Sequence, residues 1–195
     1  MTEILTPDFA VDPRVLALAA KIKLLLFDVD GVLTDGRLVI GDDGQEYKAF
    51  NSRDGHGIKM LQAHGVAVGI ITGRSSRVVK HRVKDLGIKH VYQGCVDKLP
   101  VYRKLIATLR LAPEQTGYVG DDVVDLPIML HAGLAVAVQN AHSLAKKYAH
   151  WTTPSIGGYG AAREVCEMIL RAQGHYQLAM EKYISPPDKP KPRGK

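Results

Sequence analysis

The chain is poor in cysteine, in aromatic residues and in long apolar runs, and each shortage excludes a class of protein. Cys95 and Cys166 are the only cysteines among the 195 residues, and they lack the paired spacing of a metal site. We expect two reduced thiols in a cytoplasmic protein. No apolar run approaches the roughly 20 residues of a membrane-spanning helix. The start carries acids and a proline where a secretory signal has basic and then apolar residues, so we expect no export.

Aromatic residues make up only 6% of the chain. This shortage matters because the formal net charge of +6 could otherwise indicate a nucleic-acid partner. Half of the excess charge lies in residues 185–195, which hold four basic residues and one acid. A second basic cluster, residues 74–84, contains no aromatic side chains that could stack on bases. The charge pattern therefore favours a small anionic metabolite over nucleic acid.

Two common nucleotide-binding loops are also missing. No Gly-x-x-x-x-Gly-Lys-Ser/Thr sequence occurs, and Gly31 lacks the spaced glycines of a dinucleotide-binding turn. The histidines that lie in helical patterns form no i,i+4 pair, so we expect none of them to bind a metal. These histidines are His56, His64, His81 and His131.

Five strand-like apolar runs recur along the chain, mostly separated by helical patterns. This alternation predicts an α/β fold with a doubly wound parallel sheet. Several runs are almost continuously apolar, which is typical of strands that are covered on both faces. In such a sheet, ligands bind at the carboxyl ends of the strands. The runs are residues 24–29, 66–71, 90–93, 117–119 and 134–138.

The composition divides the chain into three parts. Residues 1–17 form an N-terminal segment, and residues 18–174 hold the strand and helix patterns of one core domain. Residues 175–195 form a C-terminal tail in which these patterns weaken. Within the tail, residues 186–195 are rich in proline and lysine, so we expect them to be extended or disordered in an isolated chain.

A β-hairpin is predicted over residues 36–50, where a larger cap domain could otherwise stand. Two β-prone runs flank a Gly-Asp-Asp-Gly turn at residues 41–44. An isolated hairpin would leave Leu38, Ile40 and Tyr47 exposed, and such a hairpin is only marginally stable in water. Self-association would cover these side chains, and folding of the hairpin onto its own domain is the alternative.

Two carboxylates, Asp28 and Asp30, follow the first strand directly. Residues two apart in an extended segment point the same way. The first carboxylate can attack phosphorus and help to hold Mg²⁺, while the second can transfer the leaving group's proton. Gly31 permits the sharp turn behind them. An Asp-x-Asp pair alone is more typical of a solvated turn or a helix cap. Further residues suited to phosphate or metal are therefore needed to favour the catalytic interpretation.

Residues suited to phosphate or metal also occur at the ends of later strands and at the start of a later helix. Thr72 ends the second strand and is followed by Gly73 and Arg74, while Lys98 opens a later helix. A lysine at a helix start opposes the helix dipole, which argues against a merely solvated side chain. The third strand ends in three further carboxylates, Asp121, Asp122 and Asp125.

The order of these motifs resembles that of the haloacid dehalogenase-like superfamily of phosphatases. Residues 28–34 look like its first motif, Thr72 its second, Lys98 its third and residues 120–125 its fourth. The resemblance spans about residues 18–174 and is closest to members that act on phosphorylated 2-keto sugar acids. The closer similarity lies in residues 48–55, 71–75, 92–94 and 163–167.

The resemblance implies a minimal-cap, Mg²⁺-dependent phosphomonoester hydrolase that works through an aspartyl phosphate. The implied substrate is the 8-phosphate of an eight-carbon 3-deoxy-2-keto sugar acid used in lipopolysaccharide synthesis. A nine-carbon, sialic-acid-type 9-phosphate is the nearest alternative, and a non-catalytic oligomerisation domain is the alternative from another class. The resemblance also implies a homotetramer in which the hairpins meet.

Each site residue has an expected role. Asp28 is the nucleophile, and Asp30 is the general acid and then the base. The side chains of Asp28 and Asp121 and the main-chain carbonyl of Asp30 form the expected Mg²⁺ ligands. Thr72 donates its hydroxyl to the phosphoryl group, and Lys98 supplies a positive charge. Two acids have supporting roles: Asp125 holds the metal water or the lysine, and Asp122 does the same or caps a helix.

Substrate specificity should come from groups further out. Arg74 can bind a sugar-acid carboxylate with its planar fork, and the Gly73 amide can donate to the phosphate. For Lys59 and Arg82, a solvated helix face is the alternative. By resemblance, the chain lacks one arginine, because Tyr159 stands where the pattern has a basic residue. The full set of expected substrate contacts is Asp30, Asn51, Ser52, Arg53, Asp54, Gly55, Lys59, Gly73, Arg74, Arg82 and Lys98.

Overall fold

The computed structural model of the chain describes residues 7–184, so the prediction for residues 186–195 lies outside the described part. A parallel sheet with the strand order β5-β4-β1-β6-β7-β8 forms its centre. Every predicted run is a strand of this sheet, which confirms the α/β fold class. Only the two-residue β8 lies outside the predictions. The strands are β1 (Leu24–Phe27), β4 (Ala67–Ile71), β5 (His90–Tyr92), β6 (Thr116–Gly120), β7 (Leu134–Ala137) and β8 (Trp151–Thr152).

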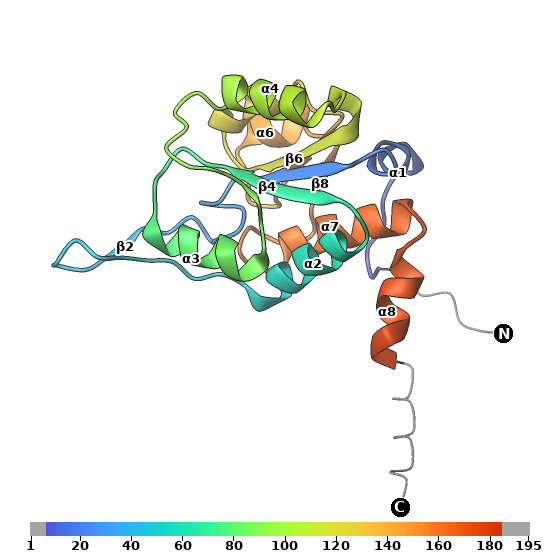
Figure 1. The fold of residues 1–195 in the computed structure, drawn as a ribbon, viewed down its shortest axis with the longest axis horizontal. Coiled ribbons are helices and arrows are strands. Elements are labelled where there is room, and N and C mark those ends of the chain that lie inside the picture. The colour runs from blue at the N-terminus through green and yellow to red at the C-terminus, as the bar shows by residue number, and fades with distance from the viewer. Residues whose placement is uncertain (1–6, 185–195) are drawn as a thin grey trace, which may run out of the picture.

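Helices cover both faces of the sheet. Figure 1 shows α4 and α6 on one face and α2, α3 and α7 on the other. Every residue of β1, β6 and β7 is buried, as expected for strands packed on both sides. No helix within residues 7–184 has the length and apolar character needed to cross a membrane. The helices are α1 (Pro13–Ala19), α2 (Ser52–Ala63), α3 (Arg77–Leu86), α4 (Lys98–Leu109), α5 (Leu126–Met129), α6 (Ser143–Tyr148), α7 (Ala161–Ala172) and α8 (Tyr176–Ile184).

The strand register brings the motif residues to one edge of the sheet. β1 lies between β4 and β6, and Phe27 is aligned with Ile70 on one side and with Val119 on the other. The chain therefore leaves all three strands at the same edge. The residues that follow these strands must come close together there, whatever their separation in the sequence.

The predicted hairpin is present and consists of β2 (Val39–Ile40) and β3 (Glu46–Tyr47), paired antiparallel. It extends away from the body of the molecule (Figure 1). Leu38, Ile40 and Tyr47 are each more than 50% exposed. The hairpin therefore does not cover its apolar side chains on its own domain, which was the alternative to self-association. Both cysteines are free thiols, as predicted.

Candidate active site

A pocket of about 350 Å³ opens at the carboxyl edge of the sheet. Its volume lies within the range of small-molecule sites. It collects the residues that the four motifs predicted, from the ends of β1, β4 and β6 and from the start of α4. The lining residues are Asp28, Asp30, Thr72, Gly73, Arg74, Cys95, Val96, Lys98, Asp121, Asp122 and Val124.

Asp28 lies at the bottom of this pocket and is 6% exposed. Its main-chain N–H donates to the Val119 carbonyl at 3.0 Å, which extends the β1–β6 pairing by one residue. Its Oδ1 atom is buried and accepts no hydrogen bond within residues 7–184, although the Lys98 ammonium lies 3.1 Å away. Burial, followed by the charge of Asp125, raises the pKa of Asp28 to about 6. Oδ1 is thus paired with one cation but lacks a well-oriented hydrogen-bond donor, so the buried carboxylate can accept a further ligand.

Lys98 is held by a buried network below the pocket. Its ammonium donates to Asp125 Oδ1 at 2.7 Å and to the Tyr118 hydroxyl at 3.3 Å. The Tyr118 hydroxyl donates to the same Asp125 oxygen at 2.6 Å. Burial favours loss of the lysine's proton, but the charges of Asp28 and Asp125 outweigh it, so the pKa of Lys98 is raised. The network therefore holds a cation directly beside Asp28.

The second Asp125 oxygen organises the loop after β6. Oδ2 accepts the main-chain N–H groups of Asp121 at 2.9 Å and Asp122 at 3.2 Å. Asp122 in turn accepts the N–H of Val123 at 2.7 Å. Of the two roles predicted for Asp122, the structure therefore shows the cap, here of the short 3₁₀ helix Val123–Asp125. Asp125 supports Lys98 and the loop with both of its oxygens.

Asp121 lies against the turn that follows β1. A Cβ atom on Gly31 would lie 2.1 Å from Asp121 Oδ2, and Gly31 has a φ of +95°. Both facts require glycine at this position. Burial, followed by the charges of Asp125, Asp28 and Asp122, raises the pKa of Asp121 to about 8. The close approach of acids is therefore costly unless a cation joins them.

The carboxylates of this pocket fit a divalent cation. Asp28, Asp121 and Asp125 each offer an oxygen, and these oxygens lie within 4.8 Å of one another. The oxygens of Asp125 already accept hydrogen bonds from Lys98, Tyr118 and two amides. Asp28 and Asp121 have fewer such commitments; they are the two side-chain ligands expected from the sequence, and that assignment stays a prediction. Hard cations such as Mg²⁺ prefer such oxygen ligands.

The Asp30 carboxylate points towards the hairpin. It forms a salt bridge with Lys48, and Arg74 Nε lies 3.8 Å from its Oδ2. Glu46 Oε1 lies 3.1 Å from the Lys48 ammonium and accepts a 3.3 Å hydrogen bond from Arg74. Sequence reasoning missed Glu46 and Lys48 as site residues. Their spacing of two within a predicted strand was the available signal, because such residues share one face.

Comparisons with known proteins identify the family of the chain. The profile of the haloacid dehalogenase-like hydrolase family matches residues 91–164. The chain is 52% identical over 155 residues to the 3-deoxy-D-manno-octulosonate 8-phosphate phosphatase KdsC of Yersinia pestis, covering 80% of this chain and 83% of that protein. It is 48% identical over 164 residues to KdsC of Escherichia coli K12, covering 84% and 87%. The chain belongs to the KdsC family of haloacid dehalogenase-like hydrolases. It is therefore a phosphomonoester hydrolase, which confirms the resemblance seen in the four motifs.

Solved structures of related proteins share the fold. A probable YrbI family phosphatase from Pseudomonas syringae is 50% identical, with a TM-score of 0.89, and the match covers 90% of this chain and 99% of that one. The 3-deoxy-D-manno-octulosonate 8-phosphate phosphatase from Moraxella catarrhalis was solved with a magnesium ion, a phosphate ion and a KDO molecule. It is 39% identical, with a TM-score of 0.86, and the match covers 87% of this chain and 98% of that one.

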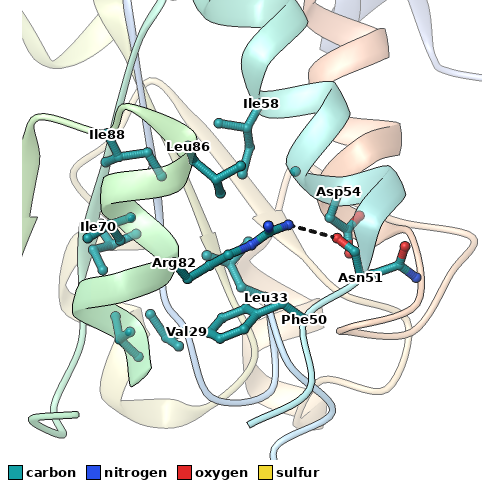
Figure 2. Close-up of a pocket in the computed structure, with 13 residues that line it drawn as sticks. Val29, Leu33, Phe50, Asn51, Asp54, Ile58, Ile70, Arg82, Leu86 and Ile88 are labelled. Carbon is teal, nitrogen blue, oxygen red and sulfur yellow. Dashed lines mark hydrogen bonds between the residues drawn. The ribbon is translucent and has the colours of Figure 1, made fainter. Parts of the chain in front are cut away.

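Several residues that resemblance to this family assigned to substrate lie outside the pocket. Asn51, Gly55 and Arg82 line a separate, mostly apolar cavity between α2 and α3 (Figure 2). There Arg82 donates to the Asn51 carbonyl at 3.2 Å, and its guanidinium lies 5.7 Å from the centre of the Phe50 ring. A Cβ atom on Gly55 would lie 2.2 Å from the Arg82 Nη2 atom. Arg82 therefore links α3 to the segment at the base of the hairpin, and its other donor pairs with the exposed Asp85 at 3.1 Å. Its predicted substrate contact stays a prediction.

Asp54 also has a packing role. It is 2% exposed, and its two oxygens accept the N–H groups of Gly160 at 3.3 Å and Arg163 at 2.8 Å. Burial, opposed by these hydrogen bonds, raises its pKa. Asp54 therefore holds the start of α7 within one chain. Ser52, Arg53 and Lys59 are exposed on α2, so their predicted substrate contacts stay predictions that this pocket does not support.

The loop that contains Tyr159 packs on the first motif. A Cβ atom on Gly157 would lie 1.7 Å from the Gly31 carbonyl oxygen, so only glycine allows this approach. Gly158 donates its N–H to the Val32 carbonyl at 2.9 Å. Tyr159 is 51% exposed, and its carbonyl accepts a 3.3 Å hydrogen bond from Arg53. The tyrosine side chain adds no cation to the pocket.

Proposed function

We propose that the protein hydrolyses 3-deoxy-D-manno-octulosonate 8-phosphate to the free sugar acid and phosphate in the cytoplasm, as a step of lipopolysaccharide precursor synthesis. The observation that carries the proposal is the buried Asp28 carboxylate, whose Oδ1 atom is ion-paired with the Lys98 ammonium at 3.1 Å and accepts no hydrogen bond within residues 7–184. Curated relatives at 48% to 52% identity are phosphatases of this substrate, and they support the same assignment here.

Asp28 is the proposed nucleophile. Its carboxylate attacks phosphorus in line, an aspartyl phosphate forms, and the bond from phosphorus to the sugar oxygen breaks. Lys98 stabilises the charge that develops on the transferring group. Thr72 is 2% exposed and its main-chain atoms are fixed by hydrogen bonds to Tyr92 and Cys95, which leaves its hydroxyl to donate to a phosphoryl oxygen.

Asp30 is the proposed general acid and base. It protonates the sugar oxygen as that oxygen leaves, and the resulting carboxylate takes a proton from the water that attacks the aspartyl phosphate. Phosphate and free Asp28 are the products of this second step. Both side chains line the pocket, and that of Asp30 is 17% exposed against 8% for Asp28, so Asp30 lies nearer the opening, where a leaving group would be.

Mg²⁺ is the proposed metal, and Asp28, Asp121 and the main-chain carbonyl of Asp30 would hold it. The fit rests on the Asp28 oxygen that accepts no hydrogen bond and on the closely spaced carboxylates whose pKa values burial and mutual repulsion raise. When bound, the ion neutralises charge between the anionic nucleophile and the anionic phosphate. The Moraxella catarrhalis relative with its magnesium ion supports the choice.

Arg74 is the proposed contact for the sugar-acid carboxylate. Its side chain is 48% exposed at the pocket mouth, and its one hydrogen bond within residues 7–184, to Glu46, is 3.3 Å long. A planar guanidinium can bind a carboxylate through two parallel hydrogen bonds. A nine-carbon sugar acid 9-phosphate carries the same two anionic ends, so it is the second candidate substrate.

The proposal is tested by phosphate release from purified protein. We expect strong preference for 3-deoxy-D-manno-octulosonate 8-phosphate over the nine-carbon 9-phosphate and over hexose phosphates, and loss of activity after chelation of Mg²⁺. Preference for the nine-carbon ester would keep the chemistry and change the substrate. If none of the esters releases phosphate in a metal-dependent way, the proposal is contradicted and a non-catalytic assembly role is favoured.

A further inference from the structure

The residue directly after the second strand of the hairpin, Lys48, has a buried side chain that lies behind the active-site residue Asp30. The Lys48 side chain is 1% exposed, although the hairpin around it is largely in solvent. Buried lysines are rare unless their charge is compensated. Lys48 contacts two carboxylates, Asp30 from the first motif and Glu46 from the adjacent strand β3.

These contacts hold the Asp30 carboxylate from outside its own turn. Asp30 lies in the turn after β1, and Lys48 is its closest charged partner, since Arg74 Nε lies 3.8 Å from the other carboxylate oxygen. Arg74 also bonds to Glu46, so two cations and two carboxylates form a closed set. A carboxylate held from two sides has little freedom to leave the pocket mouth.

Lys48 itself does not line the pocket that holds Asp28, Thr72 and Lys98. Its ammonium is directed at Asp30 and Glu46, and almost none of its surface is open to a ligand. Any effect of Lys48 on phosphate release must therefore pass through the residue it touches.

We propose that Lys48 is a positioning residue that holds Asp30 where it meets the leaving-group oxygen, so that the hairpin becomes a working part of the active site. This inference rests on the proposed function, because it assigns Asp30 the proton transfer. It deepens that proposal by giving the hairpin a task in the chemistry of its own chain. Misplacing a catalytic group by about 1 Å can cost about a hundredfold in rate.

The test uses Lys48→Met, which keeps the length and apolar stem of the side chain and removes its charge. With 3-deoxy-D-manno-octulosonate 8-phosphate, we expect kcat to fall about 10- to 100-fold, while KM stays within about threefold. Lys48→Arg keeps a cation and should recover part of the loss. Lys104→Met, on the exposed surface of α4, is the control and should match the wild type.

A double-mutant cycle with Asp30→Asn separates positioning from general structural damage. Measured with enzyme in excess, so that slow residual turnover is visible, the double variant should lose no more than about twofold beyond Asp30→Asn alone. Losses that multiply, or a Lys48→Met enzyme with normal kcat, would overturn the inference. A wild-type enzyme that releases no phosphate would instead overturn the proposed function.

Discussion

The Tyr118 hydroxyl donates a 2.6 Å hydrogen bond to Asp125 Oδ1, and this fully buried pair lies directly beneath Lys98. Among the acids of residues 7–184, Asp125 alone binds both the lysine of one motif and the loop amides of another. Because Tyr118 also accepts a hydrogen bond from Lys98, the three side chains have one mutually consistent arrangement. The position of the cation beside Asp28 therefore depends on a residue that cannot touch the substrate.

Replacing Tyr118 by phenylalanine should weaken catalysis as well as stability. The change removes a donor from Asp125 and an acceptor from Lys98, so we expect a loss of about 1 to 2 kcal/mol in the free energy of unfolding and about tenfold in kcat. Tyr102→Phe is the matched control, since Tyr102 is also buried and bonds Thr116 at 2.8 Å, far along β6 from the site. It should lose stability but keep kcat. Equal losses of kcat in both variants would refute the role of Tyr118.

Asp28→Asn should abolish phosphate release and yet stabilise the metal-free fold. Burial raises the pKa of Asp28 to about 6, so the ionised carboxylate destabilises the folded protein at neutral pH. We expect asparagine to add about 1 to 3 kcal/mol to the free energy of unfolding above about pH 6, by linkage. The folded protein binds the Asp28 proton more tightly than the unfolded chain does, so the stabilisation by asparagine should vanish at about pH 4, where Asp28 is protonated in the folded protein.

Urea unfolding with a chelator present, at pH values on both sides of this window, measures the effect. Asp42→Asn, on the exposed hairpin turn, is the control and should change nothing. A variant that turns over like the wild type would contradict the assignment of the nucleophile. A variant that is less stable than the wild type at pH 7 would contradict the electrostatic argument.

Much of the site was predictable from the sequence because strand order fixes it. Asp28, Thr72, Lys98 and Asp121 each follow or open an element whose apolar pattern is plain, and parallel strands bring such positions to one edge. Their assembly needs no knowledge of side-chain packing. The predicted grouping of these residues in one pocket is therefore confirmed, while their individual catalytic roles stay proposals.

The remaining residues depend on contacts that a linear pattern does not contain. Lys48 and Tyr118 matter because of what lies across from them, on the turn after β1 and the start of α4. Asp54 and Arg82 are the reverse case, because their charges suit a substrate but their hydrogen bonds are made within the protein. Asp54 accepts from the start of α7, and Arg82 donates to the Asn51 carbonyl. The contacts that distinguish these residues arise from tertiary packing, which a linear pattern does not contain.

Mg²⁺ should bind more tightly as the pH rises. Burial and neighbouring acids raise the pKa of Asp121 to about 8, so the metal-free protein holds a proton there at pH 7 that a cation must displace. We expect the apparent affinity to increase by up to about tenfold between about pH 7 and 8. Thermal unfolding at several Mg²⁺ concentrations measures this affinity. Asp121→Asn should lose most of the stabilisation by Mg²⁺, and a pH-independent affinity in the wild type would contradict the prediction.

The hairpin should hold the subunits together. Ile40, the last residue of β2, is 58% exposed. We expect a homotetramer of the 21.3 kDa chain in which the hairpins bury such side chains against one another. Ile40→Asp places a charge in that contact and should yield a smaller species in light scattering coupled to size-exclusion chromatography. Leu178→Asp, at an equally exposed position on α8, should leave the mass unchanged. An unchanged mass for Ile40→Asp would contradict the prediction that the hairpins form the subunit interface.

Arg74→Lys should separate recognition of the sugar acid from recognition of phosphate. Lysine keeps the positive charge near Glu46 but cannot offer two parallel donors to a carboxylate. We expect KM for 3-deoxy-D-manno-octulosonate 8-phosphate to rise about tenfold, whereas KM for phenyl phosphate, which has no carboxylate, should change less than about twofold. Steady-state kinetics on both esters gives the comparison. If both KM values rise together, Arg74 serves the phosphate or Asp30, and the carboxylate of the substrate is bound by another group.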